Sequence, residues 1–139
     1  MDSLFLDTNI LVDVIIRREP FFADSQKIWR MVETGHAEGW IAAISFNNIH
    51  YLARKLEDAS KANAAMEKLH KLFRTAPVDD TIIGEAIALQ FKDFEDAIQY
   101  ACAKQTGCPW LLTRNVADFP GSKKPQAITP KDFLLARSG

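Results

Sequence analysis

The chain is poor in cysteine, carries almost no net charge and contains no long apolar run. Its two cysteines, Cys102 in an apolar helical pattern and Cys108 beside a proline, predict reduced thiols rather than a disulfide. They also lack the neighbouring cysteines and histidines that a zinc site requires. No apolar run approaches the roughly 20 residues that span a bilayer, and no secretion signal is recognisable. We therefore expect a cytoplasmic protein without membrane association.

The formal net charge of −1 argues against indiscriminate binding to nucleic acid. It does not exclude a nucleic-acid substrate, because a divalent metal ion or a local basic patch can hold a polyanion on a nearly neutral protein. Hydrophobic residues make up 47% of the chain and charged residues 25%, as in ordinary globular proteins. This length and composition predict a single domain over residues 1–139 with a core of its own.

What the sequence does contain is an alternation of short apolar runs and helical patterns. The apolar runs are continuous, which is typical of strands in a parallel sheet covered by helices on both faces. We therefore predict an α/β fold, a three-layer α/β/α sandwich with a central, mainly parallel sheet. The predicted strands are 3–6, 40–44, 110–113 and 126–129, with 77–79 a short strand or connector. The predicted helices are 9–18, 22–34 (ended by Gly35), 45–57 (capped by Ser45), 60–74, 81–91, one from 93 that ends by 107, and a terminal one from 130.

Three aspartates follow or open apolar segments that are far apart in the chain. Asp7 follows the first apolar run, Asp96 opens an apolar helical pattern, and Asp118 follows the run that begins at Trp110. An α/β sheet brings such positions together at one end, where ligands usually bind. Clustered carboxylates repel one another and persist mainly where a cation holds them, and Mg²⁺ prefers oxygen ligands. The sequence therefore predicts a metal-dependent enzyme acting on phosphate, with these three aspartates as catalytic and metal-binding residues.

Asp7, Thr8 and Asn9 lie between the first predicted strand and the first predicted helix. Because a helix N-terminus favours negative charge, we expect Asp7 to stay ionised, while Thr8 or Asn9 caps the helix and orients Asp7. A plain turn residue is the alternative interpretation of Asp7. Asp13 lies further along the same helix, where an acid exposed to solvent is a simpler interpretation than an outer metal ligand.

The segment from Asp93 to Asp96 places three carboxylates at a helix start. Helix capping alone explains Asp93 as the N-cap and Asp96 as the residue three positions later. The functional interpretation instead directs Asp96 into the site, because the apolar stripe beside it faces the core, and leaves Glu95 pointing towards solvent.

Thr113, Arg114, Asn115 and Asp118 leave the strand that begins at Trp110. Asn115 and Asp118 are both within reach of a site at that end of the sheet, although Asp118 could equally cap a turn. Arg114 is a candidate for binding a substrate phosphate through two hydrogen bonds, and a solvated surface arginine is the alternative.

Taken together, these segments resemble the PIN domain, the nuclease fold shared by the VapC-type toxins of bacterial toxin–antitoxin pairs. The matching stretches are residues 7–13 (DTNILVD), 43–52 (AISFNNIHYL), 93–97 (DFEDA) and 112–119 (LTRNVADF). Four stretches in this order, spread over nearly the whole chain, are fairly specific.

The resemblance implies an active site of three or four acids that bind Mg²⁺ or Mn²⁺. The family's first acid falls on Asp7 and its third on Asp96. Its second, normally a glutamate, falls on Asn48, and its fourth on Asn115 or, three residues later, on Asp118. Asn48 and Asn115 each offer a carbonyl oxygen but no charge. For Asn48, a hydrogen bond that caps its helix is an equally good interpretation.

The activity that the resemblance implies is metal-dependent hydrolysis of phosphodiester bonds in single-stranded RNA, with the toxin of a toxin–antitoxin pair as one candidate role. The residues expected to orient ligands or water are Thr8, Asn9, Asn48, Thr113 and Asn115. One alternative is a PIN-like module that binds RNA or protein with weakened catalysis, which the two amides at 48 and 115 favour. A phosphatase that uses acids and Mg²⁺ is less well supported, because it would need an acid where Asn9 stands.

The helices predicted at 45–57 and 60–74 are the candidate partner surfaces. Their apolar residues could serve a homodimer, as in many members of the family, or a groove for a small antitoxin protein. Burial inside the monomer explains most of the same residues.

Overall fold

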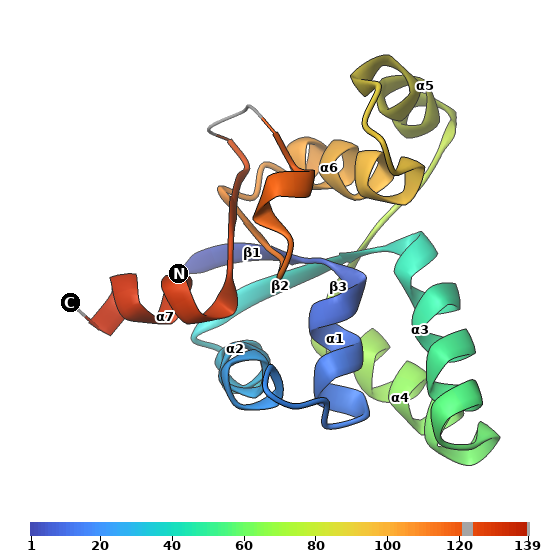
Figure 1. Ribbon diagram of the computed structural model, residues 1–139, viewed down its shortest axis with the longest axis vertical. Coiled ribbons are helices and arrows are strands. Elements are labelled where there is room, and N and C mark those ends of the chain that lie inside the picture. Colours follow the sequence, from blue (N-terminus) through green and yellow to red (C-terminus); the bar gives the residue numbers. More distant parts are fainter. Residues whose placement is uncertain (121–123, 139) are drawn as a thin grey trace.

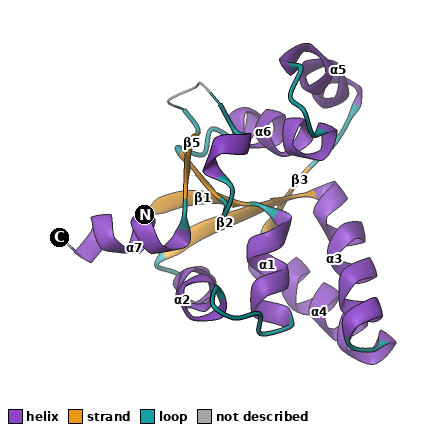
Figure 2. Ribbon diagram, viewed as in Figure 1, coloured by secondary structure: helices purple, strands orange, loops and turns teal. Residues whose placement is uncertain are grey.

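The computed structural model describes residues 1–120 and 124–138. Parallel strands form one sheet in the order β3-β2-β1-β4-β5, which lies between two layers of helices (Figures 1 and 2). The strands are β1 (Asp2–Leu6), β2 (Ala37–Ala42), β3 (Arg74–Ala76), β4 (Trp110–Leu112) and β5 (Gln126–Ile128). The predicted three-layer α/β/α sandwich with a parallel sheet is confirmed.

The helices divide unequally between the two faces of the sheet (Figure 1). The larger layer contains α1 (Thr8–Ile15), α2 (Phe22–Glu33), α3 (Ala43–Leu56), α4 (Ala59–Leu72) and α7 (Pro130–Ser138). The smaller layer contains α5 (Asp80–Leu89) and α6 (Phe94–Thr106), and the short 3₁₀ helix η1 (Val116–Asp118) follows β4. None of the helices formed by residues 1–120 and 124–138 is long and apolar enough to cross a membrane.

Strand β1 lies at the centre of the sheet and contributes to the core on both faces. Leu4 and Leu6 pack into the core beneath the larger helical layer, whereas Phe5 packs into the core beneath α5 and α6. All three side chains have an exposed fraction of 0%. Burial on both faces is the physical reason that this strand is a continuous apolar run in the sequence.

The strand register brings the segments that follow β1 and β4 side by side. Leu6 pairs with Leu112, and the backbone N–H of Asp7 donates to the carbonyl oxygen of Leu112 at 3.0 Å. One step further along the sheet, the N–H of Thr113 donates to the carbonyl oxygen of Ile128 at 3.0 Å. Because all strands are parallel, their carboxyl ends share one edge, and the predicted acids therefore meet there.

Several predicted boundaries are wrong, and tertiary contacts explain the differences. Strand β2 begins at Ala37 rather than residue 40, because pairing with β1 recruits residues of low strand propensity. Its Gly39 has no room for a side chain, since a Cβ would lie 2.6 Å from the ring of Phe73. Helix α3 begins at Ala43, so Ser45 lies inside the helix and does not cap it. Strand β3 begins at Arg74, which the sequence assigned to the end of a helix, because Arg74 pairs with β2, and residues 77–79 form a connector.

Other local predictions are confirmed. Gly35 adopts a φ of +80° directly after the end of α2, and Gly107 adopts a φ of +77° at the C-cap of α6. Glycine reaches such left-handed conformations without steric cost, which makes it a common helix terminator. Cys102 and Cys108 are both buried, unpaired thiols.

Candidate active site

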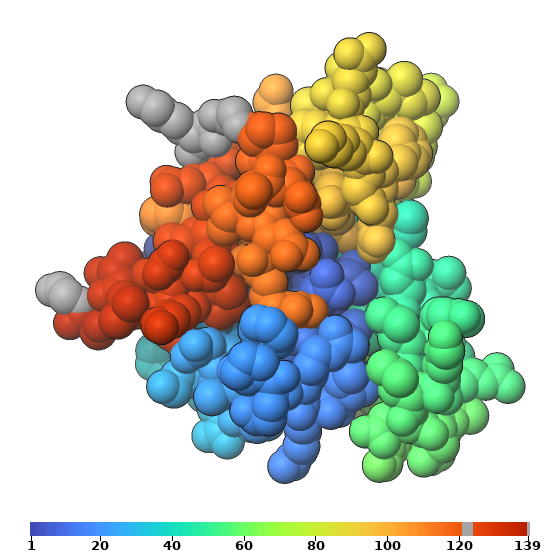
Figure 3. Space-filling model, in the orientation of Figure 1, coloured from blue at the N-terminus to red at the C-terminus, as the bar shows by residue number. Residues whose placement is uncertain are grey.

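A pocket of about 360 Å³ lies at the carboxyl ends of β1 and β4. We call it the acid pocket, and it is lined by Asp7, Thr8, Asn9, Asn48, Tyr51, Leu52, Asp93, Glu95, Asp96, Asn115 and Asp118. In the space-filling view, the N-terminal segment (blue) reaches the surface between the segment that follows β4 (orange) and α3 (green) (Figure 3). None of the described residues that line the pocket is basic. The structure thus brings all three predicted catalytic aspartates to one polar pocket.

Asp7 is the most buried acid of the pocket, with an exposed fraction of 4%. Its Oδ2 accepts a hydrogen bond from the Thr113 hydroxyl at 2.9 Å, and that hydroxyl accepts one from the backbone N–H of Asn115 at 3.1 Å. The predicted capping of α1 by Thr8 or Asn9 is wrong. Asp7 itself occupies the N-cap position and makes no side-chain capping bond, while Thr8 is the first helical residue.

The electrostatics of the pocket oppose the ionisation of its acids. Burial raises the pKa of Asp7 to about 6, and the nearby Glu95 carboxylate adds to that rise, whereas the hydrogen bond from Thr113 opposes it. The pKa of Asp96 rises to about 7, first through burial and then through the charge of Asp7, with smaller contributions from Asp93 and Asp118. The helix start therefore does not outweigh the desolvation of Asp7, contrary to the expectation of an ordinary ionised carboxylate.

Asp96 and Asp118 approach the pocket from different elements. Asp96 is half-buried in the first turn of α6, where its backbone N–H donates to the Asp93 side chain at 3.0 Å. Asp93 is therefore the N-cap, as predicted, while the Asp96 carboxylate remains part of the pocket lining. Asp118 closes η1 and is exposed to solvent. A larger hollow of about 750 Å³ adjoins the acid pocket, with which it shares Asp93, Asp96 and Asp118.

A buried polar network, which the residue patterns did not predict, lies behind the acid pocket. The Gln99 amide nitrogen donates to the hydroxyls of Thr8 at 3.1 Å and Ser45 at 2.8 Å. These hydroxyls lie 2.8 Å apart, and that of Thr8 donates to Glu95 Oε2 at 3.2 Å. Asn48 Nδ2 donates to the same carboxylate oxygen at 2.6 Å.

The prediction that Glu95 points towards solvent is therefore wrong. Glu95 is half-buried and lines the acid pocket. A usable signal was present in the sequence, because Glu95 and Gln99 are four residues apart and so share one side of a helix whose neighbouring positions are apolar. A polar side chain in an apolar stripe needs a buried partner, and here the partners come from two other elements.

Asp13 and Arg114 do not belong to the acid pocket. The prediction that Asp13 is exposed to solvent is wrong, since its exposed fraction is 0%. Asp13 Oδ2 lies 2.9 Å from Arg114 Nε, and Oδ1 lies 3.8 Å from Arg18 Nε. The Arg114 guanidinium also lies over the Phe21 ring, 4.1 Å from its centroid. Substrate binding by Arg114 stays a prediction, and the structure gives this side chain an internal partner instead.

The donor chemistry of the acid pocket suits a hard divalent cation. Carboxylate and amide oxygens are the ligands that Mg²⁺ and Mn²⁺ prefer, and acids with raised pKa values gain from a neighbouring positive charge. Within the part of the chain that the structure describes, no three acidic, histidine or cysteine side chains are drawn together closely enough to form a finished ligand set.

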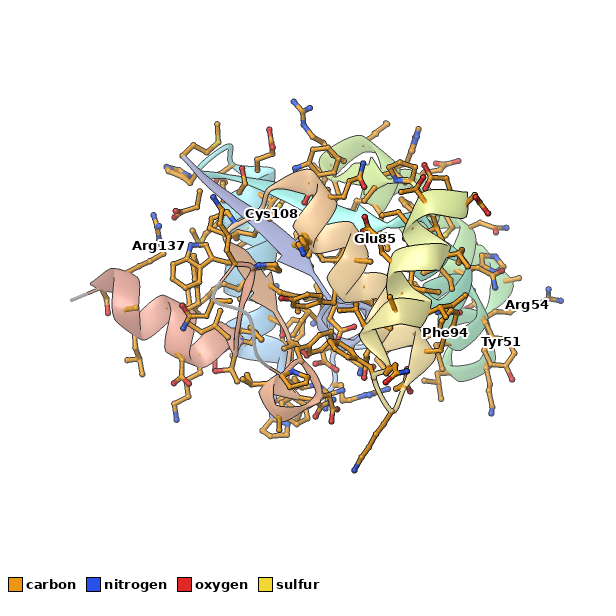
Figure 4. The ribbon with its side chains drawn as sticks, turned by 90° about the horizontal axis from the view of Figure 1, so that it is seen from above. Tyr51, Arg54, Glu85, Phe94, Cys108 and Arg137 are labelled. Carbon is orange, nitrogen blue, oxygen red and sulfur yellow. The ribbon has the colours of Figure 1, made fainter. Side chains whose placement is uncertain are left out.

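The rim of the acid pocket presents an exposed aromatic ring. Tyr51 of α3 lines the pocket and has an exposed fraction of 63%. Phe94, the first residue of α6, is also exposed, and both side chains lie at the same end of the molecule, opposite Arg137 (Figure 4). Such rings offer flat faces on which unpaired nucleobases can stack.

Comparison with known proteins relates this architecture to one family. The PIN domain family model matches residues 3–117. Ribonuclease VapC1 of Aquifex aeolicus (strain VF5) is 23% identical over 137 residues, which cover 95% of this chain and 93% of that protein.

Solved structures show the same fold. A toxin–antitoxin complex from Klebsiella pneumoniae contains a chain with 26% identity and a TM-score of 0.68, covering 93% of this chain and 98% of that one. DNA-bound VapBC from Salmonella typhimurium gives a TM-score of 0.70 at 17% identity, covering 94% of this chain and 99% of the other. The family model spans most of the chain. The chain therefore belongs to the PIN domain family.

Proposed function

We propose that this protein is an endoribonuclease that hydrolyses phosphodiester bonds of single-stranded RNA with the help of Mg²⁺ or Mn²⁺. Residues 1–139 would form one catalytic domain. Asp7, Asp96 and Asp118 would hold the metal ion. The ribonuclease name of the Aquifex aeolicus relative supports the choice of RNA as substrate.

The observation that carries the proposal is the convergence of carboxylates in one pocket. Asp7, Asp96 and Asp118 line one pocket, and no described lining residue is basic. Burial, helped by neighbouring carboxylates, raises the pKa of Asp7 to about 6 and that of Asp96 to about 7, so ionisation of these two acids weakens the fold near neutral pH. A pocket with this electrostatic cost is best explained by an external cation that removes it.

The residues of the pocket would divide the chemistry between them. Bound Mg²⁺ supplies a Lewis acid for the scissile phosphate and lowers the pKa of water. Thr113 fixes one oxygen of Asp7 through its 2.9 Å hydrogen bond. Asn9 and Asn115 line the same pocket and can donate to phosphate oxygens or to the attacking water. Tyr51 stands at the rim, where its exposed ring can stack on an unpaired base.

We further propose that the protein acts as the toxin of a toxin–antitoxin pair. The support is its similarity to a chain of the Klebsiella pneumoniae toxin–antitoxin complex. A small antitoxin protein is then the expected partner, and homodimerisation stays a prediction from the resemblance. The cytoplasmic location expected from the sequence stays a prediction as well.

The test is cleavage of labelled single-stranded RNA in Mg²⁺ or Mn²⁺ by the native protein and by Asp96→Asn. We expect cutting that stops in EDTA and is lost in the variant, while Asp80→Asn, an exposed acid in the first turn of α5, leaves it unchanged. Failure to cut or bind any of several RNAs would remove the RNA assignment and leave the family membership intact.

A second candidate is a PIN-like module that binds RNA or protein with weakened catalysis. The observation in its favour is that no finished metal ligand set exists among the described residues, with amides at positions 48 and 115. It predicts RNA binding that EDTA does not change and no cutting in the same assay. The phosphatase alternative is not proposed, because the chain belongs to the PIN domain family.

A further inference from the structure

Position 48 in α3 carries an amide where the resemblance places the second acid of the family. The Asn48 side chain lines the acid pocket, and its Nδ2 donates to Glu95 Oε2 over 2.6 Å. Asn48 belongs to the larger helical layer and Glu95 to the smaller one, so the contact bridges the two layers at the edge of the sheet. An amide at position 48 thus touches a carboxylate that reaches the same pocket from another helix.

The hydrogen bonds of the buried network are donated in the direction of Glu95. Thr8 has one hydroxyl proton, and it is donated to Glu95 Oε2 at 3.2 Å. The 2.8 Å contact between Thr8 and Ser45 must therefore be donated by Ser45. Gln99 donates to both hydroxyls from behind. One carboxylate oxygen of Glu95 therefore accepts two hydrogen bonds, one from Thr8 of this network and one from Asn48.

The second carboxylate oxygen of Glu95, Oε1, is available to a ligand in the acid pocket. Both hydrogen bonds that the described residues make to this carboxylate fall on Oε2, and the side chain is half-buried at the pocket wall. Its charge acts on the other acids, since it contributes to the raised pKa of both Asp7 and Asp96. Glu95 is also free of a capping role, because Asp93 is the N-cap of α6.

We infer that Glu95 supplies the carboxylate that this chain lacks at position 48. Glu95 is a metal-binding residue of the acid pocket, and Asn48 is the positioning residue that holds it there. The site thereby keeps the same number of carboxylates, but one of them comes from α6 instead of α3. The inference rests on the proposed function, because it concerns a metal ion in that same pocket.

The experiment is a titration with Mn²⁺ alone, in which free Mn²⁺ is followed by electron paramagnetic resonance. Glu95→Gln keeps the shape and the acceptor oxygen of the side chain but removes its charge. We expect the Mn²⁺ dissociation constant to rise at least tenfold, within the range that loss of a ligand or of its support produces. Glu85→Gln, an exposed glutamate on α5, is the matched control and should leave the constant unchanged (Figure 4).

The double variant Asn48→Glu, Glu95→Gln reverses the exchange. It returns the carboxylate to α3 and places an amide donor at position 95, so the inter-helix hydrogen bond can form in the opposite direction. We expect its Mn²⁺ dissociation constant to return to within about threefold of the native value. If the role of Glu95 were purely structural, Glu95→Gln would instead unfold at a lower temperature without metal. A charge restored at position 48 would then not restore Mn²⁺ binding.

Each outcome decides the inference. Native Mn²⁺ affinity in Glu95→Gln would overturn it, and so would weakened binding that the double variant fails to restore. Both of these leave the proposed function standing, provided that the native protein binds Mn²⁺ and cuts RNA. Absence of Mn²⁺ binding in the native protein would instead overturn the proposed function and this inference together.

Discussion

Asp7 and Asp13 are two buried aspartates in the segment that follows β1, and their charged neighbours differ. Asp7 has an exposed fraction of 4% and Asp13 of 0%, and burial raises the pKa of both carboxyl groups. The charges of Arg114 and Arg18 oppose that rise at Asp13. At Asp7, the neighbouring carboxylate of Glu95 adds to the rise, the hydrogen bond from Thr113 opposes it, and Arg114 is the last of the groups that lower the pKa.

The difference separates a structural acid from a candidate catalytic one. The charge of Asp13 is balanced inside the protein, by Arg114 at 2.9 Å and Arg18 at 3.8 Å. The charge of Asp7 lies among other acids that have no basic partner in the described pocket lining. Burial alone therefore does not mark a functional acid, whereas burial without an ion-pair partner makes an acid a candidate for function.

The largest expected effect is the loss of cleavage in Asp7→Asn. Removal of a metal-binding charge should lower the rate of metal-dependent RNA cleavage about 10²- to 10⁴-fold, since a metal ion contributes several kcal/mol to such reactions. Its thermal unfolding without metal at pH 8 should be unchanged or shifted upwards, because a charge that burial disfavours has been removed. Single-turnover cleavage and a melting curve of the same sample check both parts. Full cleavage by this variant would show that Asp7, like Asp13, has a structural role and not a catalytic one.

Asp13→Asn should show the opposite pattern. Breaking the ion pair leaves Arg114 without its carboxylate partner in a largely buried position, which costs about 3 kcal/mol in the free energy of unfolding. Urea denaturation measures this loss, with the exposed Asp132→Asn on α7 as the control expected to change stability by less than about 0.5 kcal/mol. Mn²⁺ affinity of the folded variant should stay native. A large loss of metal binding with native stability would place Asp13 in the functional site.

The smallest of the three effects is a pH dependence that belongs to the acid pocket alone. Because the pKa is about 6 for Asp7 and about 7 for Asp96, protons compete with the metal ion for these carboxylates below neutral pH. Mg²⁺ affinity should therefore rise with pH, by up to tenfold per pH unit for each displaced proton. Above about pH 7 the affinity should level off.

The same shifts affect the metal-free protein with a definite sign. Both folded-state pKa values lie above the ordinary value of 3.8, so the unfolded chain loses these protons first and stability falls as the pH rises from about 4 to about 7. The measurement is the increase in melting temperature caused by Mg²⁺ at pH 5.5, 7 and 8.5. Asp96→Asn should flatten both trends, and an increase that is equal at all three pH values would contradict the assignment.

Residue patterns predicted most of the fold and part of the site. Continuous apolar runs predicted the parallel sheet, and Gly35 and Gly107 predicted two helix ends, because these signals are local. Asp7, Asp96 and Asp118 were recognisable because each stands next to an apolar segment at a predicted strand end or helix start. Strand β3 was expected at 77–79, if at all, and lies at 74–76 because three residues form a strand there only through pairing with β2.

The sequence by itself determined the fold class and the three aspartates that share one edge of the sheet. Only the tertiary structure decided which acid has a counter-charge, since Arg114 is far from Asp13 in the chain but 2.9 Å from it in space. It also decided the direction of Glu95, which depends on Thr8 and Asn48 from two other helices. The physical reason is that apolar patterns arise from local periodicity, whereas the partners of a buried charge are chosen by long-range packing.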